Sequence, residues 1–247
     1  FTMNYSTHFL LLVHVAVAAS YSNILSQLQV CKRSDPNLNG CLRTAIQAAL
    51  PLLKNGVPEI SFPSMNPIKI EMVYINAEPP MDFDQVYSNI ELHGHADSVI
   101  TDVSTRIDEK NVIMAIKGEC NTGTLSMGLE YKDAIVFGFD LSGKGRMEQI
   151  HHDYHFLIYI EGELKPKAKH LSIRNVTVDV DLKDFSITVD LYGNQQLSKT
   201  VSKVFTDNSA LLYGAVRKEV EEIYGAAYGN LVKRLFAKIP IDELLPK

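Results

Sequence analysis

The sequence has no excess of basic residues. Its 247 residues include 24 Lys and Arg against 29 Asp and Glu, which gives a formal net charge of −5, and the isoelectric point is near 5.9. A protein that binds nucleic acid through its phosphates needs a positive surface. This composition therefore argues against a nucleic-acid partner.

The sequence also lacks an apolar run long enough to cross a bilayer, which takes about 20 residues in a helix. Near the N-terminus, Phe9 to Ala19 are apolar apart from His14, which matches the hydrophobic region of a secretory signal. We therefore expect residues 1–20 to be a signal peptide and the protein to be secreted. A membrane anchor is the alternative, but we expect no stable membrane insertion.

Cysteine is scarce, with 3 residues in the chain. Cysteines of secreted proteins usually form disulfides, and Cys31 and Cys41 enclose the turn-forming run Asp35-Pro36-Asn37. We expect these two cysteines to be bonded, which would stabilise the fold by roughly 2 to 3 kcal/mol in the chain-entropy model. Cys120 is then left over, either as a buried thiol or paired with another chain.

No catalytic motif is complete. Residues 138–145 resemble a phosphate-binding loop, but Gly145 stands where a Ser or Thr must hold magnesium. Residues 124–128 resemble a nucleophile elbow around Ser126, but they begin with Thr124, and strand-like alternation continues where an elbow needs a turn into a helix. We therefore expect no enzymatic activity, no catalytic residue and no cofactor.

Histidine occurs in two groups, residues 93 and 95 and residues 151, 152 and 155. The second group lacks the glutamate of a helical zinc motif. On a strand, His151 and His155 would share one face and His152 would lie on the other. We expect solvated strand histidines and no metal; because imidazoles titrate near neutrality, a pH-dependent role stays open.

The sequence does contain a long stretch of strand-like alternation, from Ile68 to about Leu191. Apolar residues alternate there with polar or small ones, as on strands that present one face to a core. No repeat, low-complexity tract or Gly/Ser linker interrupts the stretch. The predicted apolar faces are Leu125, Met127, Leu129 and Tyr131; Ile135, Phe137, Phe139 and Leu141; Val176, Val178, Val180 and Leu182; and Phe185, Ile187, Val189 and Leu191.

Helical periodicity precedes and follows this stretch. Leu42 to Leu53 shows one apolar face with Pro51 inside it, and a second helix is predicted from a cap at Asp207 to Pro240. The second helix would be on the order of 45 Å long, so it needs an extended partner. Its predicted apolar face is Leu212, Val216, Val220, Ile223, Ala227, Leu231 and Leu235. We predict one elongated α+β domain over residues 21–247, with an antiparallel sheet curled around the helices.

Several segments resemble the takeout and haemolymph juvenile hormone binding protein family of insects. They are the cysteine loop and helix of residues 31–46, the proline-rich residues 56–70, the turn at Gly143 and Gly145, and the C-terminal residues 235–247. The resemblance spans essentially all of the mature chain. It is strongest at the paired cysteines and at Phe236 to Leu245.

The resemblance implies a long C-terminal helix wrapped by a highly curved antiparallel sheet, with a shorter N-terminal helix, as in tubular lipid-binding proteins. It also implies a secreted, non-catalytic protein that binds a hydrophobic ligand in an internal cavity or tunnel, with Cys31 and Cys41 as the family disulfide. Asn66-Pro67 stands where members usually carry Asp-Pro. The haemolymph hormone carriers have a second disulfide, which Cys120 alone cannot form, and this favours the takeout-like branch.

The leading hypothesis is a secreted, monomeric carrier of a small lipophilic ligand, such as juvenile hormone, another terpenoid or a fatty acyl compound. One alternative is a protein that docks on lipid surfaces or on a receptor, and a less favoured one is a hydrolase of lipophilic esters that uses Ser126. Asn175 begins a glycosylation sequon. From periodicity, the residues expected to line a ligand cavity are Ile46, Leu50, Phe62, Tyr131, Phe137, Phe139, Val216 and Val220.

Overall fold

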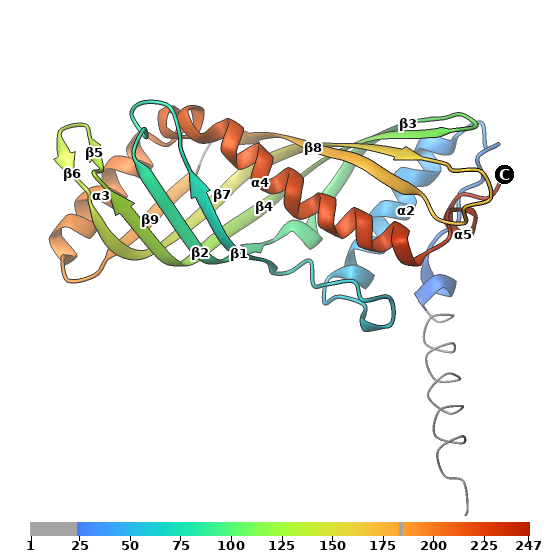
Figure 1. Ribbon diagram of the computed structural model, residues 1–247, viewed down its shortest axis with the longest axis horizontal. Coiled ribbons are helices and arrows are strands. Elements are labelled where there is room, and N and C mark those ends of the chain that lie inside the picture. The colour runs from blue at the N-terminus through green and yellow to red at the C-terminus, as the bar shows by residue number, and fades with distance from the viewer. Residues whose placement is uncertain (1–23, 183–184) are drawn as a thin grey trace, which may run out of the picture.

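A long antiparallel sheet runs the length of the molecule, and a long helix crosses its open side (Figure 1). The computed structural model describes residues 24–182 and 185–247. The predicted signal peptide therefore lies outside the described residues. The α+β architecture, with a long C-terminal helix and a shorter N-terminal one, confirms the predicted fold.

The sheet has seven strands in the part of the chain that is described, in the order β1-β2-β4-β7-β8, with β3 beside β4 and β9 beside β7. The strands are β1 Ile68–Ile75, β2 Asp84–His93, β3 Val99–Ile107, β4 Asn111–Lys132, β7 Gly143–Glu163, β8 Ser172–Leu182 and β9 Phe185–Leu191, and a separate hairpin is formed by β5 Ile135–Val136 and β6 Phe139–Asp140. The helices are α2 Leu38–Leu53, α3 Gln195–Asp207, α4 Ser209–Lys238 and α5 Ile241–Leu244, with short 3-10 helices η1 Pro58–Ile60 and η2 His95–Asp97.

Strands β4 and β7 form the spine of the sheet. They are 22 and 21 residues long and pair with each other along most of their length. At one end β2 flanks β4 and β9 flanks β7; at the other end β3 flanks β4 and β8 flanks β7. The sheet therefore has two halves, which we call the β9 half and the β8 half.

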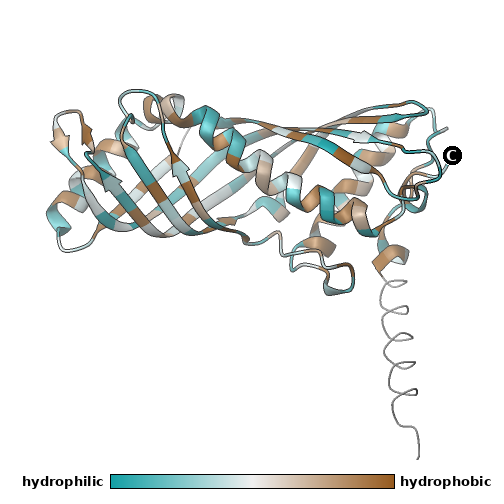
Figure 2. Cartoon of the chain, viewed as in Figure 1, coloured by the Kyte–Doolittle hydropathy of each residue, from teal (hydrophilic) through white to brown (hydrophobic). Residues whose placement is uncertain are grey.

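Hydrophobic and hydrophilic residues alternate along the strands, as the sequence predicts (Figure 2). Strand β9 buries its whole predicted apolar face, and β8 buries Val178, Val180 and Leu182. The buried side chains face the helices, so the sheet encloses its core by curling. The apolar periodicity therefore gave the correct face for both strands.

Irregular pairing between β4 and β7 makes part of the predicted alternation wrong. One register shift lies between Ser126 and Leu129, and it places Ser126 in the interior while Met127 is 50% exposed. An extra residue in one strand reverses which side chains face the core beyond it. Leu129 and Tyr131, which follow the shift, are buried as predicted.

A second register shift, between Cys120 and Thr122, changes the face of the sheet on which the β7 histidines lie. The one extra residue lies in β7, between His151 and Tyr154. His151 is therefore buried, and His155 lies on the other face, where it pairs with Asp153. The predictions that these two histidines share a face and that His151 is solvated are both wrong.

Helix α4 closes the open side of the sheet between two of its edge strands, β8 and β1. It spans nearly the predicted range, but Asp207 does not cap it, because its carboxylate accepts from Lys203 Nζ at 2.6 Å. Gly225 and Gly229 are buried against β8, where an added Cβ would lie 3.4 to 3.5 Å from the nearest atoms of Val176. These glycines allow the helix backbone to approach the strand closely.

On its other side α4 faces β1 across a surface groove. Ile70, Val73 and Ile223 line both this groove and the interior of the β9 half. The wall between the interior and the surface is therefore one side chain thick along this seam.

Helix α3 was not predicted from the sequence. Its inner face carries Ser198, Ser202 and Thr206, four residues apart, beside the free edge of β9. Each hydroxyl accepts from one backbone amide of β9, at 2.9 to 3.0 Å. The Thr206 hydroxyl donates to the carbonyl of Ile187, whereas those of Ser198 and Ser202 lie closer to carbonyls of their own helix, at 2.8 and 2.7 Å, than to those of β9. The hydroxyls thus take the place of a neighbouring strand.

Side chains of α2 and α4 likewise form hydrogen bonds to backbone groups of edge strands. Gln47 of α2 accepts from the amide of Ile100 and donates to the carbonyl of Ser98, at the start of β3. In α4, Tyr213 donates to the carbonyl of Val180 at 2.8 Å and Glu221 accepts from its amide at 3.2 Å. Helical side chains therefore satisfy backbone groups on three edges of the sheet.

We predict that Ser202→Ala lowers the free energy of unfolding by about 1 to 3 kcal/mol, because it leaves the amide of Val189 without its partner. Urea denaturation would measure the change. Thr200→Ala is the matched control, since the Thr200 hydroxyl bonds only to Gln196 of its own helix. Equal effects of the two substitutions would contradict the prediction.

Candidate functional site

Two apolar cavities lie inside the curled sheet. The α3-side cavity, in the β9 half, has a volume of about 110 Å³, and the α2-side cavity, in the β8 half, has about 220 Å³. For comparison, a dry cavity of about 150 Å³ is enough to hold benzene. Both are therefore large enough for part of an apolar molecule.

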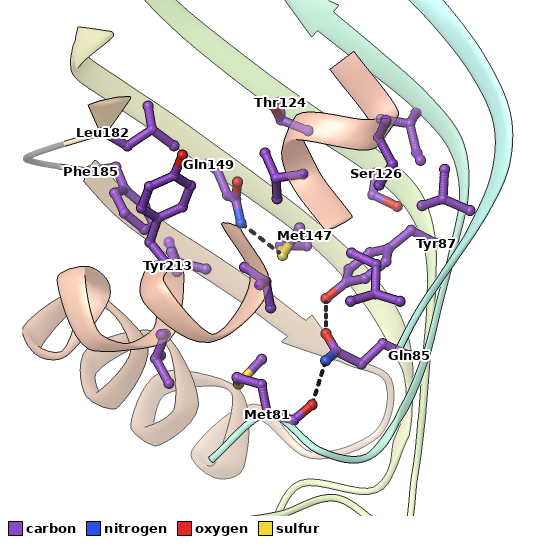
Figure 3. Close-up of a pocket in the computed structure, with 18 of the residues that line it drawn as sticks. Met81, Gln85, Tyr87, Thr124, Ser126, Met147, Gln149, Leu182, Phe185 and Tyr213 are labelled. Atoms are coloured by element: carbon purple, nitrogen blue, oxygen red, sulfur yellow. Dashed lines mark hydrogen bonds between the residues drawn. The ribbon is translucent and has the colours of Figure 1, made fainter. Parts of the chain in front are cut away.

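The α3-side cavity carries a chain of hydrogen-bonded polar side chains on one wall (Figure 3). Gln85 donates to the carbonyl of Met81 at 2.9 Å and accepts from the Tyr87 hydroxyl, which lies 3.0 Å from the hydroxyl of Tyr131. Burial raises the pKa of Tyr87 well above its usual range and that of Tyr131 to about 12. These groups are uncharged and already bonded to each other.

The α2-side cavity is almost wholly apolar. Its wall combines α2, the β3 and β4 strands, β7 and the last turns of α4, for example Leu42, Ile100, Ile116, Ile158, Leu231 and Leu235. The lining side chains with polar nitrogen or oxygen atoms are Gln29, His95, Ser98 and Tyr228. A hydrocarbon chain would be desolvated there on all sides.

No Asp, Glu, Lys or Arg of the described chain lines either cavity. An ionised group that enters such a space loses its hydration and finds no opposite charge. The interior therefore suits uncharged, largely apolar molecules.

A cluster of aromatic rings separates the two cavities, and we call it the partition. Its members are His95, His151, Tyr154, Tyr224 and Tyr228. Ring centroids of neighbours in the cluster lie 5.3 to 6.4 Å apart. Tyr224 and His151 face the α3-side cavity, while Tyr228 and His95 face the α2-side cavity.

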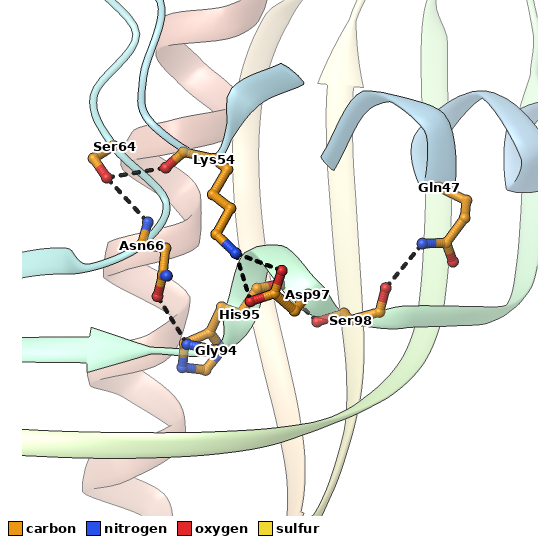
Figure 4. Close-up of polar contacts among 8 residues, drawn as sticks. All are labelled: Gln47, Lys54, Ser64, Asn66, Gly94, His95, Asp97 and Ser98. Carbon is orange, nitrogen blue, oxygen red and sulfur yellow. Dashed lines mark hydrogen bonds and ion pairs between the residues drawn. The ribbon is translucent and has the colours of Figure 1, made fainter. Parts of the chain in front are cut away.

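His95 is placed in the partition by a tightly held turn (Figure 4). Gly94, at φ 87°, starts η2 and donates its amide to Asn66 Oδ1 at 2.9 Å. Lys54 Nζ pairs with Asp97 at 2.7 Å, and the Ser98 hydroxyl donates to the carbonyl of His95. His95 is therefore a fixed, buried residue, and the prediction of a solvated strand histidine is wrong here too.

Six of the eight residues predicted to line a cavity do so. Ile46, Leu50 and Phe62 line the α2-side cavity. Tyr131, Val216 and Val220 line the α3-side cavity. Their contact with a ligand stays a prediction.

Phe137 and Phe139 line neither cavity. They lie on the β5–β6 hairpin and are 44% and 47% exposed, whereas Val136 and Leu141 are buried. Phe137 and Gly138 both have positive φ, at 50° and 82°, the conformation of a two-residue hairpin turn. This turn breaks the predicted strand: Ile135 is exposed as well, and of the predicted apolar face Leu141 is buried.

The partition was missed from the sequence. Tyr224 and Tyr228 lie one helical turn apart, and this spacing could have marked them as neighbours on α4. Tyr154 follows the β7 register shift, so strand alternation alone could not place it beside His151. His95 lies in a 3-10 turn that the period-two pattern could not reveal.

The predicted disulfide between Cys31 and Cys41 is confirmed. Cys31 donates its amide to the carbonyl of Leu244, and Arg33 pairs with Asp242 at 2.6 Å, so the cysteine loop is tied to the C-terminal segment. Cys120 is a partly buried free thiol, and burial raises its pKa to about 11. Asn175 is exposed on β8, and its glycosylation stays a prediction.

Ser126, the candidate nucleophile of a hydrolase, lies on the wall of the α3-side cavity. Its hydroxyl donates to the carbonyl of Gly128 at 2.7 Å. His151, in the same wall, bonds instead to Thr122 at 2.7 Å and to Gln149 at 3.3 Å. Strand β4 runs through Ser126 without the strand-to-helix turn that an elbow requires.

The described helices include none with the length and hydrophobicity of a membrane span.

Comparison with known proteins gives three findings. The sequence model of the haemolymph juvenile hormone binding protein (JHBP) family matches residues 10–246. The chain is 23% identical over 233 residues to the circadian clock-controlled protein daywake of Drosophila melanogaster, covering 90% of this chain and 88% of that protein. Its fold is similar to that of Takeout 1 from Epiphyas postvittana, with a TM-score of 0.74 and 20% identity, over 89% of this chain and 100% of the other.

We predict that acidification destabilises the protein through the partition histidines. Burial lowers the pKa of His95 from 6.5 to about 3 and that of His151 to about 4. Between pH 6.5 and these values the unfolded chain binds more protons than the folded one, so stability falls as the pH falls. At pH 5 the loss is about 2 kcal/mol for each histidine.

Urea denaturation at pH 7 and pH 5 would test this prediction. His95→Leu should lose about 2 kcal/mol less than the unsubstituted protein over this interval, and the exposed His152→Gln should behave like the unsubstituted protein. An unchanged pH dependence in His95→Leu would contradict the prediction.

Proposed function

The chain belongs to the haemolymph juvenile hormone binding protein family, and we propose that it is a secreted carrier of a small hydrophobic ligand. The observation that carries the proposal is the pair of internal apolar cavities with no charged lining residue. Juvenile hormone, another terpenoid or a fatty acyl compound fits this description. The carrier has no catalytic step.

Desolvation supplies the binding energy in this proposal. Burial of roughly 300 Å² of apolar ligand surface is worth on the order of 7 kcal/mol before the costs of association. The volumes of the two cavities are smaller than those of most pockets for small molecules, which are about 300 to 1,000 Å³. A ligand longer than one cavity therefore crosses the partition by displacing its rings.

The cysteines support the takeout-like branch rather than a strict hormone carrier. Cys31 and Cys41 are bonded to each other, so Cys120 has no second cysteine within the chain. Secretion as a monomer fits the disulfide and the apolar N-terminal residues 9–19.

Cavity-filling substitutions test the proposal. We predict that Val216→Phe, in the α3-side cavity, or Leu50→Phe, in the α2-side cavity, weakens the binding of labelled juvenile hormone or fatty acids by roughly tenfold, because overpacking costs about 1 to 3 kcal/mol. Displacement of a bound fluorescent probe by each lipid would measure the affinity.

Met127→Phe is the control, because Met127 is 50% exposed and lines neither cavity. A protein that binds none of these lipids, and that carries no extractable lipid when purified from its native source, would refute the carrier function.

One observation favours docking on a lipid surface as a second candidate function. The β5–β6 hairpin projects from the end of the molecule beyond α3 (Figure 1) and exposes Ile135, Phe137 and Phe139. Exposed apolar side chains grouped on a projecting tip are typical of an interaction site. A carrier that loads at a membrane could use this hairpin.

We predict that the double substitution Phe137→Ser and Phe139→Ser lowers binding to phosphatidylcholine vesicles by at least about tenfold, since burial of one aromatic side chain is worth about 1.5 kcal/mol or more. Vesicle sedimentation would measure it, with Val99→Ser, exposed in the β8 half, as the control. Equal sedimentation of both variants would rule out the hairpin as a docking site.

A further inference from the structure

Two polar atoms of the partition have no hydrogen-bond partner within 3.5 Å in the described part of the chain. They are Nε2 of His95 and the hydroxyl of Tyr154, which lies close enough to the Tyr228 hydroxyl to lower the pKa of Tyr228. Their side chains are 1% and 0% exposed, and the ring centroids lie 5.3 Å apart with the rings nearly perpendicular. A buried polar atom without a partner is unfavourable and rare in folded proteins.

The other buried histidine and tyrosine side chains named here do have hydrogen-bond partners. His95 Nδ1 lies 2.7 Å from the Tyr228 hydroxyl, both nitrogens of His151 are bonded, and Tyr87 and Tyr131 are bonded to each other. The other described side-chain atoms in this condition are on Arg33 and Thr105, outside the partition. Within the partition, His95 lines the α2-side cavity, and Tyr154 lines neither cavity but its ring contacts those of His95 and Tyr224.

The chemistry of the pair defines what it can bind. A phenol hydroxyl both donates and accepts, and a neutral imidazole Nε2 does one or the other according to its tautomer. Burial keeps His95 uncharged, and no cation lines the cavities. A carboxylate would therefore be disfavoured, whereas an uncharged oxygen would satisfy both groups.

We propose that His95 and Tyr154 form a polar anchor that binds one uncharged oxygen of the ligand, such as the hydroxyl of a long-chain alcohol. The proposal rests on the carrier function and adds a ligand class to it. His95 lines the α2-side cavity, so the oxygen lies at the inner end of that cavity. The hydrocarbon chain extends from there past Ile116, Phe156 and Leu50.

The experiment compares decanol, decane and decanoate on the full chain, by displacement of a fluorescent naphthylamine probe. The unsubstituted protein should bind decanol about fivefold to tenfold more tightly than decane, the ratio expected for one net hydrogen bond. It should bind decanoate at neutral pH more weakly than decanol. Tyr154→Phe, which removes one oxygen, should lower the ratio of decanol to decane affinity to near one.

Tyr159→Phe is the matched control. Tyr159 is half-buried on the same strand as Tyr154 and lines neither cavity. This variant should keep the full preference for decanol. Without ligand, Tyr154→Phe should leave the melting temperature unchanged or raise it, because it removes an unsatisfied buried group.

The outcomes separate this proposal from the carrier function. Binding of decane and decanol with equal affinity, or a preference for decanol that Tyr154→Phe leaves intact, overturns the anchor and leaves the carrier standing. A lower melting temperature for Tyr154→Phe with no change in preference also overturns it, since a buried water would then occupy the site. Failure of every compound to bind refutes the carrier function itself.

Discussion

The edges of the sheet set the main constraint on this molecule. A sheet that curls without closing leaves edge strands whose backbone amides and carbonyls need partners, and an uncovered edge invites pairing with another chain. Here side chains of helices supply the partners, through Gln47 on β3, the hydroxyls of α3 on β9, and Tyr213 and Glu221 on β8. Each helix is fixed along an edge by hydrogen bonds as well as by apolar packing.

This arrangement explains why the interior is hollow. Helices held at the edges span the concave face of the sheet and leave space between themselves and the spine strands β4 and β7. Gly225 and Gly229 bring α4 close to β8, while the aromatic partition fills the middle. Apolar space therefore remains at both ends, and polar side chains are more numerous in the lining of the α3-side cavity than in that of the α2-side cavity.

Periodicity predicted the elements that have a single, uninterrupted pattern. The faces of β8 and β9, helix α2, the extent of α4 and the disulfide all followed from local sequence. The pattern failed where one residue was added to a strand, as between Ser126 and Leu129, because such an insertion reverses every later side chain. Helix α3 was also missed, although Val201 and Phe205 are buried four residues apart; its face toward β9 carries Ser and Thr, residues that favour helices only weakly.

Prediction of the candidate site from periodicity failed for the same reasons. Residues on regular faces, such as Leu50 and Val216, were placed in cavity walls, whereas Phe137 and Phe139 were displaced by a turn that needs positive φ at a phenylalanine. The partition joins a 3-10 turn, a strand beyond a register shift and a helix. Its residues are up to 133 positions apart in sequence, so only the tertiary structure brings them together.

The thin wall between β1 and α4 bounds the α3-side cavity on one side. Ile70, Val73 and Ile223 separate the α3-side cavity from the surface groove. The backbone hydrogen bonds of this wall join β1 to β2 and not to α4. The extent of the α3-side cavity along this seam is therefore set by three side chains rather than by the backbone.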